Sequence, residues 1–196
     1  MKRSLNDVLV FKKKNIKKKY LQDHTIVSIK EKKLLKDFKI EHIEFVSRDI
    51  CEKNTDYKQI IPYVIVKHLD KIACYQRKGS EKRLHGKYSI GIGGHVELQD
   101  YIFEVLEPTI KNAVYRELSE EFLDFDFYKT EISFLGLINE EITDVGLTHL
   151  GFVYLLNTTR AFLPGKELEG LEWLDMFEIY KKDLELWSKM ALELIH

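Results

Sequence analysis

Short β-branched runs separated by polar turns fill the middle of this chain, and this pattern predicts a β-sheet. A turn at Asp70 and Lys71 joins the first two runs, so we expect a hairpin there. The predicted central strands cover residues 59–69, 72–77, 88–92, 132–139 and 148–157.

One apolar stripe among these runs has helical spacing instead. Ile110, Val114, Leu118 and Phe122 recur every four residues, which predicts an amphipathic helix that buries one side. Pro108 suits the first turn of this helix, because the N–H that proline lacks is not needed there.

The flanking segments are less regular. Residues 8–11, 24–29 and 171–174 predict short strands, whereas residues 32–45 mix both periods and leave their state open. Residues 175–195 predict one closing helix. Its shared apolar face consists of Ile179, Leu186, Met190 and Leu194. This order of strands and helices predicts an α+β fold, a mixed β-sheet covered by helices on both sides.

Composition favours a globular protein of the cytoplasm. The chain has 196 residues, of which 44% are apolar, enough for one core. We expect residues 1–55 to be an extension packed on a domain of residues 56–196, because no Pro/Gly-rich linker separates them. No apolar run predicts a membrane span or a signal peptide. Cys51 and Cys74 are too few for a disulfide framework, which favours a reducing compartment.

Charge is balanced overall at −1 but uneven along the chain. Residues 1–37 hold twelve Lys or Arg against four Asp or Glu, with lysine triplets at 12–14 and 17–19. Such a segment could contact nucleic acid or phosphate, or form a solvated basic surface. It lacks the interleaved aromatic residues of a groove that binds single strands, which favours the solvated surface.

Three carboxylates crowd the end of the predicted helix. Glu117, Glu120 and Glu121 fall within about 100° of arc, where like charges repel by a few tenths of a kcal/mol. A divalent cation would turn this repulsion into binding, since Mg²⁺ and Mn²⁺ prefer oxygen ligands. A solvated acidic helix face is the alternative.

This stretch resembles the signature of the Nudix hydrolases, G-x5-E-x7-R-E-U-x-E-E-x-G-U, in which U is aliphatic. Gly94 matches the first glycine, and the run from Arg116 to Glu121 (RELSEE) matches R-E-U-x-E-E at every position. The segments KQIIPY, RLHGKYSIGIGGH and the late EWL resemble a group of Nudix-type phosphoesterases. The resemblance implies a Nudix-type α/β/α sandwich.

The chain departs from the signature in three places. Asp100 stands where the family has Glu, and Arg116 follows it by sixteen positions where the family has eight. The extra residues, 101–108, are candidates for part of the substrate rim. Leu123 replaces the glycine that would end the helix, so we expect the helix to run further.

The resemblance implies divalent-metal-dependent hydrolysis of a diphosphate linkage in a nucleoside diphosphate derivative or a similar small molecule. Glu117, Glu120, Glu121 and the carbonyl of Gly94 would hold Mg²⁺ or Mn²⁺, and Arg116 would orient the acids. Relatives often place the general base in a later loop, where this chain has Glu167. Rival bases are Glu169, Glu140, Glu141 and Asp144.

Substrate contacts are less defined. His95 could contact phosphate or pack beside the glycines, and Lys87, Arg83 and Arg77 could grip phosphate or be solvated. Four aromatic residues could stack on a base, although strand aromatics more often belong to the core. They are Tyr75, Tyr88, Phe152 and Tyr154.

Other functions remain open at this level. The chain could be a Nudix-fold sensor that has lost turnover, or a pyrophosphohydrolase that acts on RNA ends through the basic N-terminal segment. Isomerisation of an allylic diphosphate would need an acid or a cysteine at the double bond, and Cys51 and Cys74 carry no motif for that role. Resemblance alone suggests a homodimer.

Overall fold

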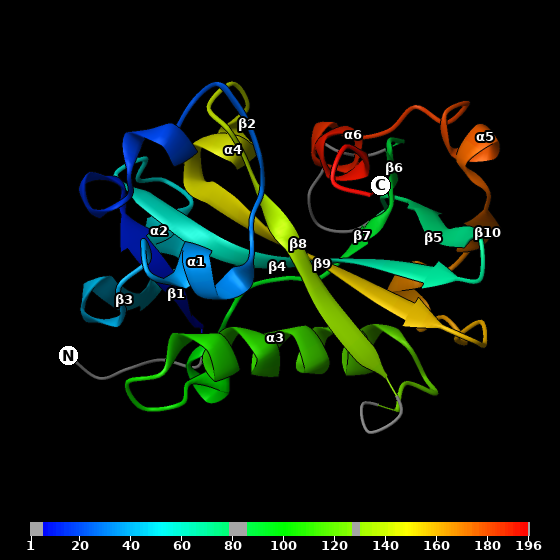
Figure 1. Cartoon of the computed structure of the whole chain (residues 1–196), viewed down its shortest axis with the longest axis horizontal. Coiled ribbons are helices and arrows are strands. Elements are labelled where there is room, and N and C mark those ends of the chain that lie inside the picture. The colour runs from blue at the N-terminus through cyan, green and yellow to red at the C-terminus, as the bar shows by residue number, and fades with distance from the viewer. Residues whose placement is uncertain (1–5, 79–85, 127–129, 196) are drawn as a thin grey trace.

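A computed structural model describes residues 6–78, 86–126 and 130–195. The described residues form a ten-stranded mixed sheet whose longest path is β10-β5-β4-β9-β8-β2 (Figure 1). Its centre is a parallel pair, β4 (Tyr57–His68) and β9 (His149–Thr158), that stays in register from Gln59 opposite His149 to His68 opposite Thr158. The α+β fold with a mixed sheet is therefore confirmed.

Antiparallel strands extend this pair on both sides. β8 (Glu131–Glu140) pairs with β9 and carries β2 (His24–Ser28) at its outer edge. β5 (Lys71–Gln76) forms the expected hairpin with β4, and β10 (Glu172–Leu174) pairs with β5. The predicted strands at these positions are thus confirmed within one or two residues.

The N-terminal segment is woven into the same sheet. β1 (Asp7–Lys12) lies between β4 and β3 (Ile43–Ser47), which α2 (Arg48–Cys51) follows. The segment with undecided periodicity contains α1 (Glu31–Leu35), a 3₁₀ turn and β3. Side chains of this segment contribute to the main core. The division at residue 55 remains a prediction, since sheet and core both continue across it.

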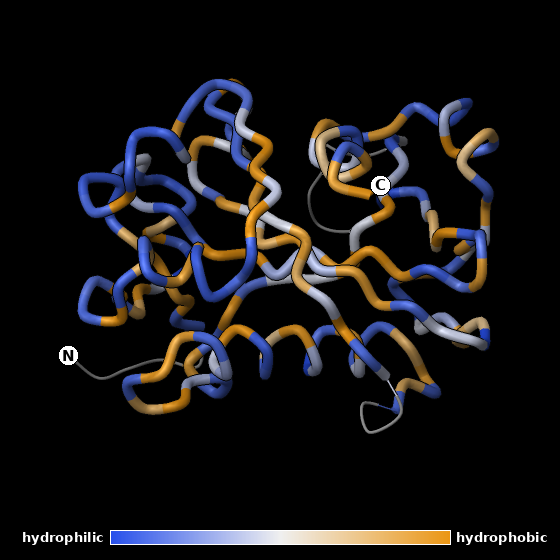
Figure 2. Tube along the Cα trace, in the orientation of Figure 1, coloured by the Kyte–Doolittle hydropathy of each residue, from blue (hydrophilic) through white to orange (hydrophobic). Residues whose placement is uncertain are grey.

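Helices cover both faces of the sheet, as Figure 1 shows with α3 (Leu106–Glu121) below and α6 (Leu186–Leu192) above. β-strand side chains alternate between the two faces of a sheet. Val64 of β4 therefore packs in the core on the α3 side, and Ile65 packs in the core on the α6 side. Apolar and polar segments alternate along α3 in Figure 2. The predicted stripe of this helix is buried, with exposed fractions of at most 2%.

Two predicted elements are broken by long-range pairing. Residues 88–92 divide into β6 (Tyr88–Ser89), which pairs with β5, and β7 (Gly91–Ile92), which pairs with β4. The single closing helix is wrong: α5 (Met176–Ile179) and α6 are separate. Tyr88 exchanges backbone hydrogen bonds with Asp183 and Glu185, so these residues cannot continue a helix.

The expected extension of the signature helix is also wrong. Helix α3 ends at Glu121, and Phe122 is already extended, with φ −117° and ψ 128°. The N–H of Leu123 donates to the carbonyl of Leu163 instead of to the helix. A backbone partner from another loop therefore ends the helix where the family uses glycine.

The remaining helix, α4 (Asp144–Thr148), begins with Thr143 as its N-cap and leads directly into β9. None of the helices in the described ranges is long and apolar enough to cross a bilayer.

Candidate active site

The glycine loop and helix α3 meet at very short range. A Cβ atom on Gly94 would lie 2.6 Å from Oε1 of Glu117, and one on Gly93 would overlap the carbonyl oxygen of Pro62. A side chain at position 94 would therefore require the Glu117 carboxylate to move away from the loop. The two ends of the sequence signature are thus brought together, as the resemblance implies.

Arg116 connects the loop to the acids. Its Nε and Nη2 donate to the two carboxylate oxygens of Asp100, both at 3.0 Å, and Nη2 also donates to the carbonyl of His95 at 2.7 Å. Its Nη1 donates to Glu117 at 2.8 Å and to Glu120 at 3.2 Å. Asp100 is therefore the bidentate partner of this guanidinium, a geometry that fixes the arginine's orientation.

The acids differ in their surroundings. Burial raises the pKa of Glu117 to about 7, against the opposing effect of Arg116. Burial also raises the pKa of Glu121 to about 7, with the charges of Glu167 and Glu120 adding to the rise. Glu120 is open to solvent, with a side chain 56% exposed. Burial thus disfavours the charged forms of two carboxylates at the border of the core.

The donor chemistry of this cluster fits a divalent cation. Oε2 of Glu121 is buried and has no hydrogen-bond partner, which is costly for a carboxylate oxygen. Carboxylate and carbonyl oxygens are the ligands that Mg²⁺ and Mn²⁺ take. Within the described residues, no three His, Cys, Asp or Glu side chains are grouped as a metal site as they stand, and Arg116 pairs with Glu117 and Glu120.

The loop after β9 brings Glu167 toward the end of α3. Gly165 donates its N–H to the carbonyl of Glu121 at 2.6 Å, and Leu168 is buried just beyond it. Glu167 lies on the exposed side of the same 3₁₀ turn, Lys166–Leu168, and its charge acts on Glu121. Among the proposed bases, this residue therefore has an electrostatic link to the acid cluster.

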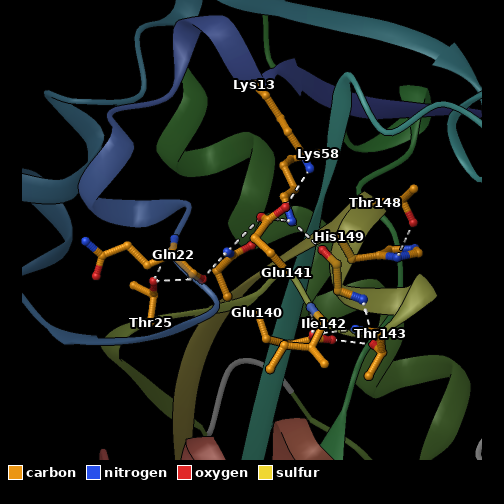
Figure 3. Close-up of polar contacts among 12 residues, drawn as sticks. Lys13, Gln22, Thr25, Lys58, Glu140, Glu141, Ile142, Thr143, Thr148 and His149 are labelled. Carbon is orange, nitrogen blue, oxygen red and sulfur yellow. Dashed lines mark hydrogen bonds and ion pairs between the residues drawn. The ribbon is translucent and has the colours of Figure 1, made fainter.

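Two of the rival bases are engaged in a polar network at the opposite end of β9 (Figure 3). Glu140 accepts from the N–H groups of Ile142 and Thr143 at 2.7 and 2.8 Å. Glu141 binds Lys13 and the fully buried Lys58, each at 2.6 Å. These carboxylates hold the loop that leads to β9.

The other two rivals are placed differently. Asp144 begins α4, before β9, and Glu169 is an exposed residue of the loop after β9. Asp144 comes just before β9, and Glu167 and Glu169 come after it. Asp144 therefore lies at the opposite end of β9 from Glu167.

A pair of histidines connects the glycine loop with the first residue of β9. Nε2 of His95 is 3.3 Å from Nε2 of His149, which also contacts the amide nitrogen of Gln59 at 3.1 Å. Burial lowers the pKa of His149 to about 4. The sequence carries no signal for this contact, because His149 is only the first residue of a strand and lies 54 positions after His95.

The cationic candidates are separated by the fold. Arg77 donates to the hydroxyl of Tyr75 at 3.1 Å, faces Glu185 at 4.0 Å, and its charge opposes the raised pKa of Glu121. Lys87 pairs with Asp183 at 2.6 Å on an exposed surface. Arg83 lies outside the described residues.

The aromatic candidates belong mainly to the core. Phe152 and Tyr154 are at most 1% exposed, and Tyr154 donates to Glu31 at 2.8 Å. Tyr75 is also buried and donates to the carbonyl of Gly91, whereas Tyr88 lies under the ammonium group of Lys182.

The cysteines are buried, and in the described part of the basic segment several lysines are paired within the chain. Cys51 and Cys74 are buried, and burial raises the pKa of both thiols to about 11. Several lysines of the N-terminal segment form ion pairs within the chain. These pairs are Lys12 with Glu44, Lys13 with Glu141, and Lys17 and Lys19 with Asp37.

Comparisons with known proteins give relatives in sequence and in fold, although no family model matches the chain. Protein YmaB of Bacillus subtilis is 33% identical over 161 residues, covering 76% of each chain. The crystal structure of Tm1382, a candidate Nudix hydrolase, superposes with a TM-score of 0.79 at 29% identity and covers 96% of this chain and 98% of Tm1382.

A more distant solved structure shows the fold alone. It is a bifunctional NMN adenylyltransferase/ADP-ribose pyrophosphatase from Francisella tularensis, complexed with AMP and a manganese ion. Its TM-score is 0.51 at 13% identity, over 70% of this chain and 41% of the other. The shared fold, the close approach of Gly94 to Glu117 and the complete R-E-U-x-E-E run lead to one conclusion: this chain belongs to the Nudix hydrolases, enzymes that act on phosphorus-containing acid anhydrides.

Proposed function

We propose that this enzyme hydrolyses a diphosphate linkage in a nucleoside diphosphate derivative or similar small molecule, and that it depends on Mg²⁺ or Mn²⁺. The observation that carries the proposal is the buried carboxylate of Glu121. Its Oε2 has no hydrogen-bond partner, and the negative charges of Glu120 and Glu167 act on it. Such an oxygen is stabilised by a cation that carries its charge. Glu117, Glu120, Glu121 and the carbonyl of Gly94 would be the ligands.

The remaining groups have defined tasks in this proposal. A bound divalent cation would polarise a phosphoryl oxygen and lower the pKa of a coordinated water. Arg116 orients Glu117 and Glu120 from a position that Asp100 fixes. Glu167 would take the proton from the attacking water, because it lies on the loop that Gly165 anchors to α3.

Substrate contacts follow from the same arrangement. Arg77 would bind a phosphate, since it is held by Tyr75 and Glu185 and its charge reaches the acid cluster. Contacts of His95 and Lys87 with the substrate stay predictions, as do the cytoplasmic location and a homodimer. The AMP bound by the Francisella structure is in keeping with a nucleotide-like substrate.

The test is a panel of nucleoside diphosphate derivatives and diphosphate sugars, assayed with and without Mg²⁺ or Mn²⁺. We expect metal-dependent turnover of at least one compound, and a loss of about 10²-fold or more in kcat for Glu120→Gln and Glu121→Gln. Glu131→Gln, which removes an exposed acid of β8, serves as the matched control. Unchanged activity in the first two variants would contradict the metal assignment.

The panel also separates the alternatives. Binding of a nucleotide without turnover would support the sensor function. An RNA 5′ end that is hydrolysed better as the RNA is lengthened would support action on RNA. The ion pairs that Lys12, Lys13 and Lys17 make within the chain give that second function no added support.

A further inference from the structure

A buried polar contact lies where the central parallel strands begin. Gln59 and His149 are register partners of β4 and β9, and their exposed fractions are 0% and 9%. The amide nitrogen of Gln59 lies 3.1 Å from Nε2 of His149, and Figure 3 shows His149 beside Thr148 and the loop before β9. Buried polar groups are kept in place by their partners, so this contact defines where the imidazole lies.

The hydrogen-bond partners determine the tautomer of His149. Its Nδ1 lies 2.8 Å from the carbonyl oxygen of Val145, and a carbonyl can only accept, so Nδ1 carries the proton. Nε2 of the neutral ring is then an acceptor. Its one lone pair faces the amide N–H of Gln59 at 3.1 Å and Nε2 of His95 at 3.3 Å, so the second contact requires that His95 carry its proton on Nε2.

His95 carries this contact to the acid cluster through its backbone. Its carbonyl accepts from Nη2 of Arg116 at 2.7 Å. The next residue, Val96, is fully buried, and its carbonyl accepts from the N–H of Leu9 at 2.8 Å. The loop is thus held by β1 at Val96 and by His149 at His95.

We propose that His149, supported by Gln59, is a positioning residue for the reaction: it holds the ring of His95, and so places the carbonyl that orients Arg116 toward Glu117 and Glu120. This inference rests on the proposed function for its effect on turnover, but not for the contacts themselves. His149 touches none of the acids, so it acts only through His95 and Arg116.

The size of the effect follows from the geometry. Misplacing a catalytic group by about 1 Å can cost about 10²-fold in rate. Loss of one hydrogen bond should displace the loop by less than this distance, so the expected loss of rate is smaller. For His149→Phe, which keeps a ring but removes the acceptor, we expect kcat to fall about tenfold with KM within about twofold. His149→Gln offers a side-chain oxygen as acceptor and should restore most of the rate.

The experiment compares wild type, both variants and His24→Phe, an exposed histidine on β2 that serves as the control. Circular dichroism and thermal unfolding establish that each variant is folded. Rates near wild type in folded His149→Phe, or equal losses in His149→Phe and His149→Gln, would overturn the proposal. A rate lost in Phe and regained in Gln would support it.

A second measurement does not depend on turnover. Long-range ¹H–¹⁵N NMR should show the Nδ1-protonated tautomer of His149, and the Nη protons of Arg116 should exchange faster in His149→Phe than in His149→Gln. An Nε2-protonated His149, or Arg116 signals unchanged in both variants, would overturn the positioning role even if the enzyme proves inactive on every substrate. If these signals behave as expected while the panel shows no turnover, only the proposed function fails.

Discussion

The backbone N–H of Gly165 donates to the carbonyl of Glu121 at 2.6 Å, which joins a loop after β9 to the last residue of the acidic helix. Phe122 and Pro164 form a β-bridge beside it. This joint explains how the helix ends without glycine at position 123. It also brings the turn that carries Glu167 next to the metal ligands that we propose.

Replacing Glu167 tests the role of that turn in catalysis. Glu167→Gln keeps the size of the side chain and removes its capacity to accept a proton. We expect kcat to fall by about 10²-fold or more, with Mn²⁺ affinity nearly unchanged, because general-base catalysis contributes about 10²–10⁴-fold. Glu169→Gln on the same loop should remain near wild type. The reverse ranking of the two variants would assign the base to Glu169.

Gly165→Ala tests the joint itself. A Cβ at this position would lie 2.8 Å from the carbonyl oxygen of Glu121, a backbone atom that moves only at a cost. We expect a loss of about 1–3 kcal/mol in unfolding free energy, typical of overpacking, together with lower kcat.

Gly170→Ala is the matched control for Gly165→Ala. No atom lies within 4 Å of its added Cβ, but its φ of +84° disfavours a side chain. We expect a loss of about 1 kcal/mol in unfolding free energy and unchanged kcat. Equal kcat in both glycine variants would show that the joint does not position the site.

Lys58 predicts a pH dependence of stability. Burial lowers its pKa from 10.5 to about 8 in the folded protein, despite its contact with Glu141. Between these two pH values the unfolded chain binds the proton and the folded chain does not, so this residue makes stability rise as pH increases from about 8 to 10.5. The slope is at most about 1.4 kcal/mol per pH unit.

The measurement is urea unfolding at pH 8, 9 and 10 for wild type and Lys58→Met. The unfolding free energy of wild type should gain on that of the variant as pH rises, because only wild type has this titration. Lys71→Met, an exposed lysine of β5, controls for the loss of one positive charge. A difference between wild type and Lys58→Met that stays constant over this range would be inconsistent with the lowered pKa.

The extra residues 101–108, which the sequence offered as part of the substrate rim, lead into the first turn of α3, far along the helix from Glu120 and Glu121, so we expect substitutions there to leave the chemistry unchanged. The N–H of Ile102 donates to Thr109 in the first turn of α3, and Leu106 precedes Glu117 by eleven residues, or about 16 Å of helix. Phe103 is 75% exposed in this loop. For Phe103→Ser we expect a change below about 0.5 kcal/mol in unfolding free energy and kcat/KM within twofold. A large change in kcat/KM would make this loop part of the substrate rim.

Much of the local structure could be predicted from the sequence, because local patterns reflect local constraints. The strands β4, β5, β8 and β9 follow from β-branched runs, and the buried stripe of α3 follows from apolar residues every four positions. The grouping of Glu117, Glu120 and Glu121 on one side of a helix needs only the helical period.

Tertiary structure decided the breaks and the contacts between distant segments. The closing helix is interrupted because Asp183 and Glu185 form backbone hydrogen bonds with Tyr88 instead of with residues of the helix. Helix α3 ends because the N–H of Leu123 donates to the carbonyl of Leu163. The contact of His95 with His149 depends on the parallel pairing of β4 with β9. Periodicity describes which side of an element is buried; it contains no information about which distant residue will supply a hydrogen bond, since that depends on how the whole chain packs.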